Sequence, residues 1–168
     1  MPMDRARWTR ESIESRGHRG VMMSIIGVTG GICCGKSTVT EILASLGAKV
    51  VDADKLGHAA YTSGSECLDK IVSTFGENVL DANGYIDRRV LGGIVFSDPA
   101  QMQMLNHIVW PYIRSMIEEE IDTCRAAPEH LKTGVLVIEA AVLIEAGWTD
   151  LVDEIWVVEV DPEVAVQR

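Results

Sequence analysis

Short runs of apolar residues alternate with segments of helical spacing along most of this chain. Four apolar runs predict strands, at residues 24–29, 48–51, 135–138 and 154–160. Residues 36–46 predict a helix, because their apolar positions recur every three or four residues. Strands that are apolar on both faces are typical of a parallel sheet covered by helices on both sides. The pattern therefore predicts an α/β fold.

The segment between the second and third strands, about residues 55–130, has mostly helical spacing. Residues 81–84 (DANG) predict a turn within it. Ser97-Asp98-Pro99 predicts a helix start, because Ser or Asp caps helices and Pro suits the first turn. Trp110-Pro111 predicts a kink or interruption in the helical run that follows. A short helix is also expected at residues 145–148, after the third strand.

Composition limits the class of protein. The chain has 168 residues, 47% of them hydrophobic, which is enough to bury the core of one domain. Lys and Arg total 15 against 25 Asp and Glu, giving a net charge of −10. An acidic surface repels phosphate backbones, so nucleic acid is not an expected partner. No run approaches the roughly 20 apolar residues that cross a bilayer, so no membrane partner is expected.

Residues 1–23 differ from the rest of the chain. They hold five arginines and three acidic residues without an apolar core, which predicts a flexible N-terminal extension rather than a secretory signal. The acidic residues argue against a mitochondrial transit peptide, which the arginines otherwise resemble. The four cysteines form no disulfide framework, which favours a reducing compartment and a cytoplasmic location.

A glycine-rich motif carries the main chemical signal. Residues 30–37, GGICCGKS, fit the pattern GxxxxGK[ST] and lie between a predicted strand and a predicted helix. In that context backbone N–H groups and the helix N-terminus form a nest for phosphates, so the motif predicts nucleoside triphosphate binding. The residues expected to bind nucleotide are Gly30, Gly31, Ile32, Cys33, Cys34, Gly35, Lys36, Ser37 and Thr38.

Three carboxylates follow predicted strands. Asp52 and Asp54 come after the second strand, and an extended backbone would point both the same way. Glu139 follows the third strand. Strand ends in a parallel sheet border the same crevice, so these groups are candidates for proton acceptance or for Mg²⁺ binding through water. Helix capping by Asp52 or Asp54 is the alternative, and one can cap while the other is catalytic.

Arg88 and Arg89 are the only arginine pair after residue 23. Paired arginines in so acidic a chain suggest an anionic substrate group. The alternative is a solvated helix turn capped by Asp87. For His107 taken alone, packing or a helix-surface position is the simpler interpretation.

The chain resembles the dephospho-coenzyme A kinases from residue 25 to residue 168. The phosphate loop is shared with many ATPases, whereas VDAD, IDRRVLGGIVF and VLIEAGW in this order are more specific. The segment EAAVLIEAGW looks closest to the kinase domain of eukaryotic bifunctional coenzyme A synthases, because many bacterial forms have proline in place of Ala141.

The resemblance implies a phosphate-loop NTPase fold of the nucleotide-kinase type, with a helical acceptor-binding insertion at about 55–130. It implies transfer of the γ-phosphate of ATP to the ribose 3′-hydroxyl of dephospho-coenzyme A, with Mg²⁺. Asp54 matches the general base, and Lys36 matches a phosphate-binding catalytic group. The other matches are Ser37, Asp52 and Glu139 at the metal, Arg88, Arg89 and His107 at the acceptor, and Arg168 at the ATP phosphates.

Two features depart from the family pattern. Cys33-Cys34 stands where the family usually has Gly-Ser, and the lid and C-terminal elements that would follow Arg168 are missing from the sequence. The alternatives are a shikimate kinase, a nucleoside monophosphate kinase, or an inactive nucleotide-binding fragment. Shikimate kinases usually carry GGxGR, whereas residues 92–95 read GGIV. The oligomeric state is not predicted.

Overall fold

Four parallel strands form the sheet that positions the candidate site. The computed structural model describes residues 23–31, 33–62, 64–127 and 131–160. The strands are β1 (Ser24–Gly30), β2 (Lys49–Asp52), β3 (Val135–Glu139) and β4 (Glu154–Val158), in the order β2-β3-β1-β4. All pairs are parallel. The predicted α/β architecture is confirmed, with strand ends displaced by at most two residues.

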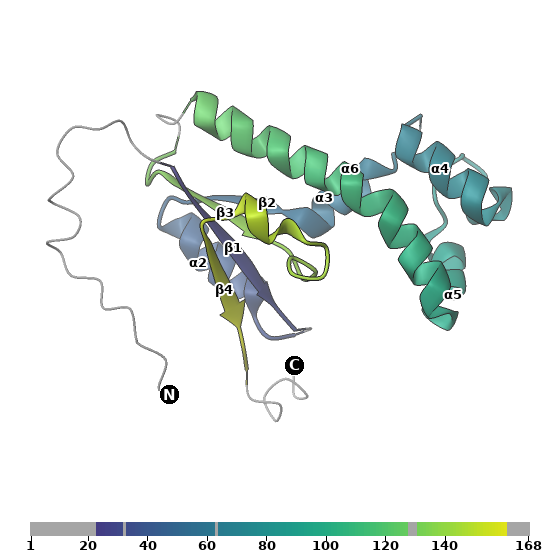
Figure 1. Cartoon of the computed structure of the whole chain (residues 1–168), viewed down its shortest axis with the longest axis horizontal. Coiled ribbons are helices and arrows are strands. Elements are labelled where there is room, and N and C mark those ends of the chain that lie inside the picture. The colour runs from purple at the N-terminus through teal and green to yellow at the C-terminus, as the bar shows by residue number, and fades with distance from the viewer. Residues whose placement is uncertain (1–22, 32, 63, 128–130, 161–168) are drawn as a thin grey trace, which may run out of the picture.

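The described segment between β2 and β3 is helical, as predicted. The α-helices of the described residues are α2 (Lys36–Ser45), α3 (Ala53–Ala60), α4 (Glu66–Phe75), α5 (Arg88–Ser97) and α6 (Pro99–Ala126). The described residues also form the short 3₁₀ helices η1 (Glu77–Val79) and η3 (Trp148–Leu151). Figure 1 shows α4, α5 and one end of α6 as a lobe that stands away from the sheet.

Helices cover both faces of the sheet. Alternate strand residues point to opposite faces, and both sets are apolar, so each face packs against helices. Ile26, Val28 and Val137 form one core cluster on the face where Leu43 of α2 packs. The second and larger cluster includes Ile25 and residues of the inserted helices, and its largest fully buried side chain is Trp148. The double-sided burial explains why the strands read as continuous apolar runs.

Short polar side chains begin four of the helices. Asp52, Ser65, Asp87 and Asp98 each accept a hydrogen bond from a backbone N–H in the first turn of the helix that follows. Pro99 follows Asp98 at the first helical position, so the predicted start of this helix is confirmed.

Two local expectations need correction. Helix α6 continues through Pro111, so an interruption at Trp110-Pro111 is wrong, whereas the other alternative, a kink, agrees with the bend of α6 in Figure 1. Neighbouring turns packed on the core maintain the helix although proline donates no N–H. The short helix expected at residues 145–148 is wrong. Residues 141–147 form turns, and the 3₁₀ helix η3 begins only at Trp148, because Gly147 has a left-handed conformation with φ 70°.

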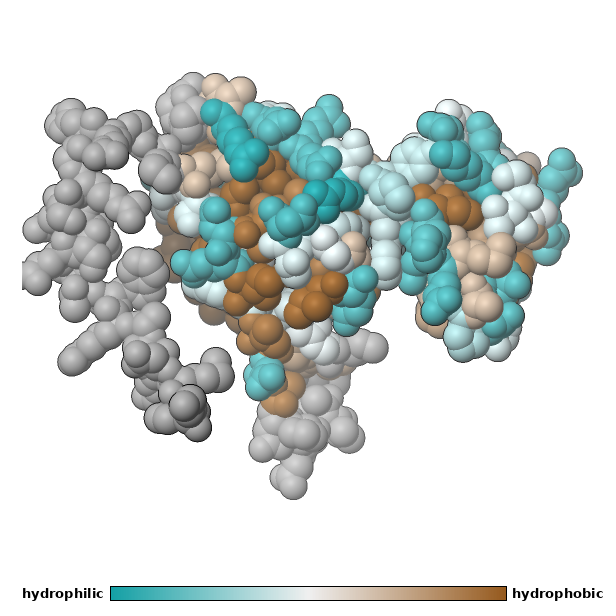
Figure 2. Space-filling view, in the orientation of Figure 1, coloured by the Kyte–Doolittle hydropathy of each residue, from teal (hydrophilic) through white to brown (hydrophobic). Residues whose placement is uncertain are grey.

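The edge strand β4 is less covered than its neighbours. Ile155, Trp156 and Val157 are exposed, and Figure 2 shows apolar side chains gathered over this strand. Within the described residues, none of the helices has the length and apolar character needed to cross a membrane.

Candidate active site

The glycine-rich loop connects the end of β1 to the start of α2. Gly30 has φ 149°, and a Cβ at this position would collide with the carbonyl oxygen of Val158. Gly35 precedes α2 with φ 95°, in the left-handed region that favours glycine. Strand, turn and helix thus follow one another as the motif predicts.

The two cysteines of the loop differ in environment. Cys33 is exposed and has a positive φ of 59°, whereas Cys34 is buried. A non-glycine residue in the left-handed region carries strain, and such strain is often found at functional sites. The loop therefore accommodates side chains at both positions. Ile32, between Gly31 and Cys33, lies outside the described residues.

Lys36, the first residue of α2, reaches back across the loop. Its Nζ donates hydrogen bonds to the carbonyl oxygens of Gly30 and Gly31, both at 2.9 Å. Thr38 is exposed in the same turn of the helix. The ammonium group therefore lies over the loop whose N–H groups are the candidate phosphate ligands.

Glu139, the last residue of β3, meets two hydroxyls of α2. Ser37 Oγ donates to Glu139 Oε1 at 3.1 Å, and Thr40 Oγ1 donates to Glu139 Oε2 at 2.7 Å. Only 9% of Glu139 is exposed. The sequence analysis missed Thr40, although its position three residues after Ser37 on one helix face was a usable signal.

Asp52 and Asp54 have different local roles. The backbone turns helical at Ala53, so the expectation that an extended backbone aligns both side chains is wrong. Asp52 accepts a hydrogen bond from Lys55 N at 3.0 Å and pairs with Lys55 Nζ at 3.1 Å. Burial raises the pKa of Asp52, but the Lys55 contacts outweigh it and hold the pKa below its ordinary value. Asp52 therefore caps α3, whereas Asp54 does not cap this helix.

Burial raises the pKa of Asp54, and the negative charges of Asp52 and Glu139 raise it further. Lys36 and His58 act in the opposite direction, so Asp54 lies within electrostatic reach of the phosphate loop. A carboxyl with a raised pKa beside a phosphate loop has the character of a proton acceptor.

Two cavities are lined by residues that follow the carboxyl ends of β2 and β3. One, of about 250 Å³, brings Ser37, Asp52 and Glu139 together. The other, of about 440 Å³, lies between α3, the end of α5, and α6, and Asp54 is part of its lining. Asp54 thus connects the loop region with a large, mainly apolar cavity. Sequence reasoning missed the remaining polar lining, which consists of His58, Tyr61 and Asn106.

The dephospho-CoA kinase family model matches residues 24–168. The chain belongs to the dephospho-CoA kinase family.

Curated members of the family are similar over most of the chain. A dephospho-CoA kinase of Geobacter sulfurreducens is 47% identical over 146 residues, which cover 87% of this chain and 72% of that protein. One from Staphylococcus aureus is 40% identical over 148 residues, covering 88% and 69%. Both relatives are bacterial, and the likeness of residues 139–148 to the eukaryotic bifunctional synthases stays a prediction.

Solved structures agree on the fold. A crystal structure of a Thermus thermophilus protein superposes with a TM-score of 0.68 and 32% identity, covering 86% of this chain and 70% of that one. The dephospho-CoA kinase of Campylobacter jejuni gives 0.62 and 32%, covering 80% and 66%. The phosphate-loop NTPase fold of a kinase is confirmed.

Not all of the residues predicted to bind the acceptor or ATP lie in the cavities of the dephospho-CoA kinase site. Arg88 and Arg89 are exposed in the first turn of α5, after the cap Asp87. The charge of Arg88 acts on Tyr61 by lowering its pKa against the larger effect of burial, which places Arg88 near the cavity. His107 is exposed, its Nδ1 lies 2.8 Å from the carbonyl oxygen of Gln103, and it is not part of the cavity lining. Arg168 lies outside the described residues.

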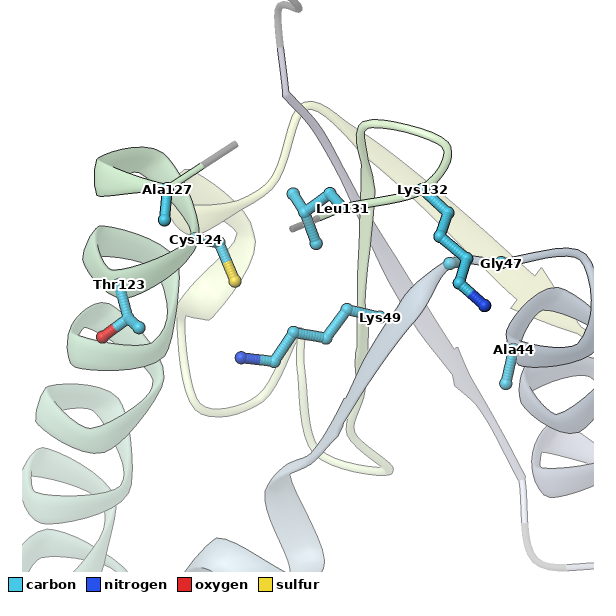
Figure 3. A pocket seen from close by; sticks show the side chains of 9 residues that line it. Ala44, Gly47, Lys49, Thr123, Cys124, Ala127, Leu131 and Lys132 are labelled. Atoms are coloured by element: carbon cyan, nitrogen blue, oxygen red, sulfur yellow. The ribbon is translucent and has the colours of Figure 1, made fainter. Parts of the chain in front are cut away.

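A further cavity of about 330 Å³ lies near the amino ends of β2 and β3, beside the C-terminal part of α6 (Figure 3). Lys49 extends into it and pairs with Glu120 at 2.7 Å. The dephospho-CoA kinase chemistry belongs to the carboxyl ends of the strands, where the phosphate loop lies.

Proposed function

We propose that this chain transfers the γ-phosphate of ATP to the ribose 3′-hydroxyl of dephospho-coenzyme A. One observation carries the proposal: Asp54 lines the apolar cavity and is also within electrostatic reach of Lys36 and Glu139. A phosphoryl-transfer site needs donor and acceptor pockets that meet at one catalytic group.

The phosphate loop holds the donor in this proposal. Its backbone N–H groups and the N-terminus of α2 face the phosphates, and the Lys36 ammonium exchanges its carbonyl partners for phosphate oxygens. The loop contributes mainly backbone groups, so Cys33 and Cys34 replace smaller residues without loss of phosphate ligands. Thr38, in the first turn of α2, and Arg168 remain proposed contacts of the nucleotide.

The residues around the smaller cavity suit Mg²⁺. Ser37 supplies a hydroxyl, and Asp52 and Glu139 supply carboxylates beside it. Among the described residues, no group of three His, Cys, Asp or Glu side chains can hold a metal alone. Mg²⁺ usually combines one or two carboxylates with waters and substrate phosphates, and when bound it neutralises charge on the phosphate oxygens.

Asp54 is the proposed base. Its carboxylate accepts the proton of the 3′-hydroxyl as the oxygen bonds to the γ-phosphorus, while the bond to the bridging oxygen breaks and ADP leaves. The helical insertion, about residues 55–130, binds the acceptor. Arg88 and Arg89 are proposed to face its anionic diphosphate, and His107 is the weaker candidate because it does not line the cavity.

A thermal-denaturation scan tests the proposal without requiring turnover. ATP, dephospho-coenzyme A and shikimate are added separately at about 100 times their dissociation constants, or at millimolar concentration where none is measurable. Saturation at this level raises Tm by about 5–10 °C for a chain of this size. Shifts with the first two ligands and none with shikimate are expected. A shift with ATP alone, or with shikimate, contradicts the acceptor assignment.

A coupled assay of ADP release completes the test. ADP release that depends on dephospho-coenzyme A supports catalysis by the chain. Binding of both ligands without turnover contradicts the catalytic part of the proposal and supports the interpretation as an inactive nucleotide-binding fragment.

A further inference from the structure

We infer that Asn106 recognises the adenine base of the acceptor, with the ring of Phe96 stacked on the face of that base. The inference rests on the proposed function, because it places the acceptor in the cavity lined by Asp54. The phosphate loop and Asp54 do not discriminate between acceptors with different bases. The inference names residues that do.

The proposed role of Asp54 sets the position of the ribose. The reacting hydroxyl must lie at Asp54, in the first turn of α3. The base is attached to C1′, two ring atoms from C3′, and we place it in the cavity that Asp54 lines. Asn106 and Trp110 of α6 and Phe96 of α5 line that cavity together with Asp54. Its volume of about 440 Å³ lies within the range of small-molecule sites.

Asn106 has the hydrogen-bonding groups that adenine requires. An asparagine amide presents one acceptor and donors side by side, which match the N6 amino group and N7 of adenine in a bidentate pair. Among the described residues, no side chain or backbone group forms a hydrogen bond with the Asn106 amide, so it is available to a ligand. The rest of the lining near it is apolar or aromatic.

Phe96 is largely exposed at the rim of the same cavity. It lies near the C-terminal end of α5 and is 84% exposed, although it lines the cavity. Stacking of an aromatic side chain on a base is worth about 1–3 kcal/mol and does not depend on which base is present. Phe96 therefore contributes affinity, whereas Asn106 contributes discrimination.

The test compares dephospho-coenzyme A with its analogue carrying hypoxanthine, in which oxygen replaces the 6-amino group. Dissociation constants are measured by calorimetry for the unmodified chain and for Asn106→Ala. A bidentate contact predicts that the unmodified chain prefers adenine by about 5- to 150-fold. Asn106→Ala is expected to lose that preference by weakening only the adenine ligand. Phe96→Ala is expected to weaken both ligands by the same factor, and Phe96→Trp to preserve both.

The controls separate failure of the inference from failure of the proposed function. Asn83→Ala changes an exposed turn outside the cavity and should leave both constants unchanged. All variants should keep the Tm shift produced by ATP, which shows that they fold. Equal binding of the two ligands by the unmodified chain, or an intact preference in Asn106→Ala, overturns the inference alone. Absence of any dephospho-coenzyme A binding overturns the proposed function as well.

Discussion

Thr40 Oγ1 donates a hydrogen bond of 2.7 Å to Glu139 Oε2, and both side chains are buried. The contact joins the helix after the phosphate loop to the end of β3. Together with the Ser37 hydroxyl it holds a carboxylate for which the described residues supply no ion-pair partner. A buried carboxylate is costly without compensation, so the arrangement suits a site that is completed by a bound cation.

Thr40→Val tests the structural part of this relationship. The substitution keeps the shape of the side chain but removes a donor from a buried carboxylate. We expect the free energy of unfolding to fall by about 1–3 kcal/mol in urea denaturation. Thr40→Ser should retain most of the stability. Thr38→Val, two residues away and exposed, should change it little, and an equal loss there would contradict the explanation.

Local patterns in the sequence predicted the sheet, the phosphate loop and the site carboxylates. The apolar runs of the strands are long because both faces are buried, and the loop motif includes its own flanking strand and helix. The family segment VLIEAGW also has a structural role: Leu143 and Trp148 are fully buried, and a Cβ on Gly27 would press against Leu143. VLIEAGW therefore distinguishes this family partly through residues that pack the core and not only through residues of the site.

The acceptor cavity could not be predicted in the same way. Phe96 and Asn106 belong to different helices, and they share a cavity with Asp54 only because α3, α5 and α6 pack together. No spacing in the sequence encodes that packing. The apolar and polar pattern also did not show which of Asp52 and Asp54 caps the helix. That depends on the residue at which the strand ends and the helix begins.

Lys36→Ala should abolish turnover and leave the fold intact. Among the described residues, the hydrogen bonds of Lys36 Nζ go to carbonyl oxygens of its own loop, so its loss removes a phosphate ligand rather than a link to the core. We expect the rate of ADP formation to fall by about 10²–10³-fold or more. The circular dichroism spectrum should not change. Lys70→Ala, on the outer helix α4, is the matched control, and a similar loss of rate there would refute the assignment.

Alkylation of Cys33 should report nucleotide binding directly. Cys33 is the exposed cysteine of the loop, whereas Cys34, Cys67 and Cys124 are buried. Iodoacetamide should therefore modify Cys33 first, as measured by peptide mass spectrometry over time. ATP should slow that modification by about tenfold when about nine-tenths of the sites are occupied, because phosphates would cover the loop. Equal rates with and without ATP would mean that the nucleotide does not bind there.

Asp54→Asn should lower kcat by about 10²–10⁴-fold with little change in the Tm shift produced by ATP. The base must be ionised, and burial with nearby negative charge raises the pKa of Asp54. The acidic limb of the kcat/KM profile should therefore lie above the pH expected of an ordinary aspartate. The residual activity of Asp54→Asn should lack that limb. A variant with a nearly normal rate would rule out this residue as the base.

The same substitution should stabilise the folded chain at neutral pH. A carboxyl whose pKa is higher in the folded than in the unfolded state disfavours folding once it is ionised. Replacement by Asn removes that unfavourable charge. Because Asp54 is partly exposed, solvent screening limits the gain to within about 1 kcal/mol.

The pH dependence of this gain has a definite sign. Below the unfolded pKa of about 3.9 the carboxyl is protonated in both states, so the advantage of Asp54→Asn should vanish there. The advantage should grow as pH rises through the folded pKa and then stay constant. Urea denaturation between about pH 3 and 8 measures it, with Glu119→Gln on an exposed part of α6 as control. If Asp54→Asn still raises the free energy of unfolding at the lowest pH, the cause is packing and not charge. An increase confined to higher pH shows that the active-site charge opposes folding.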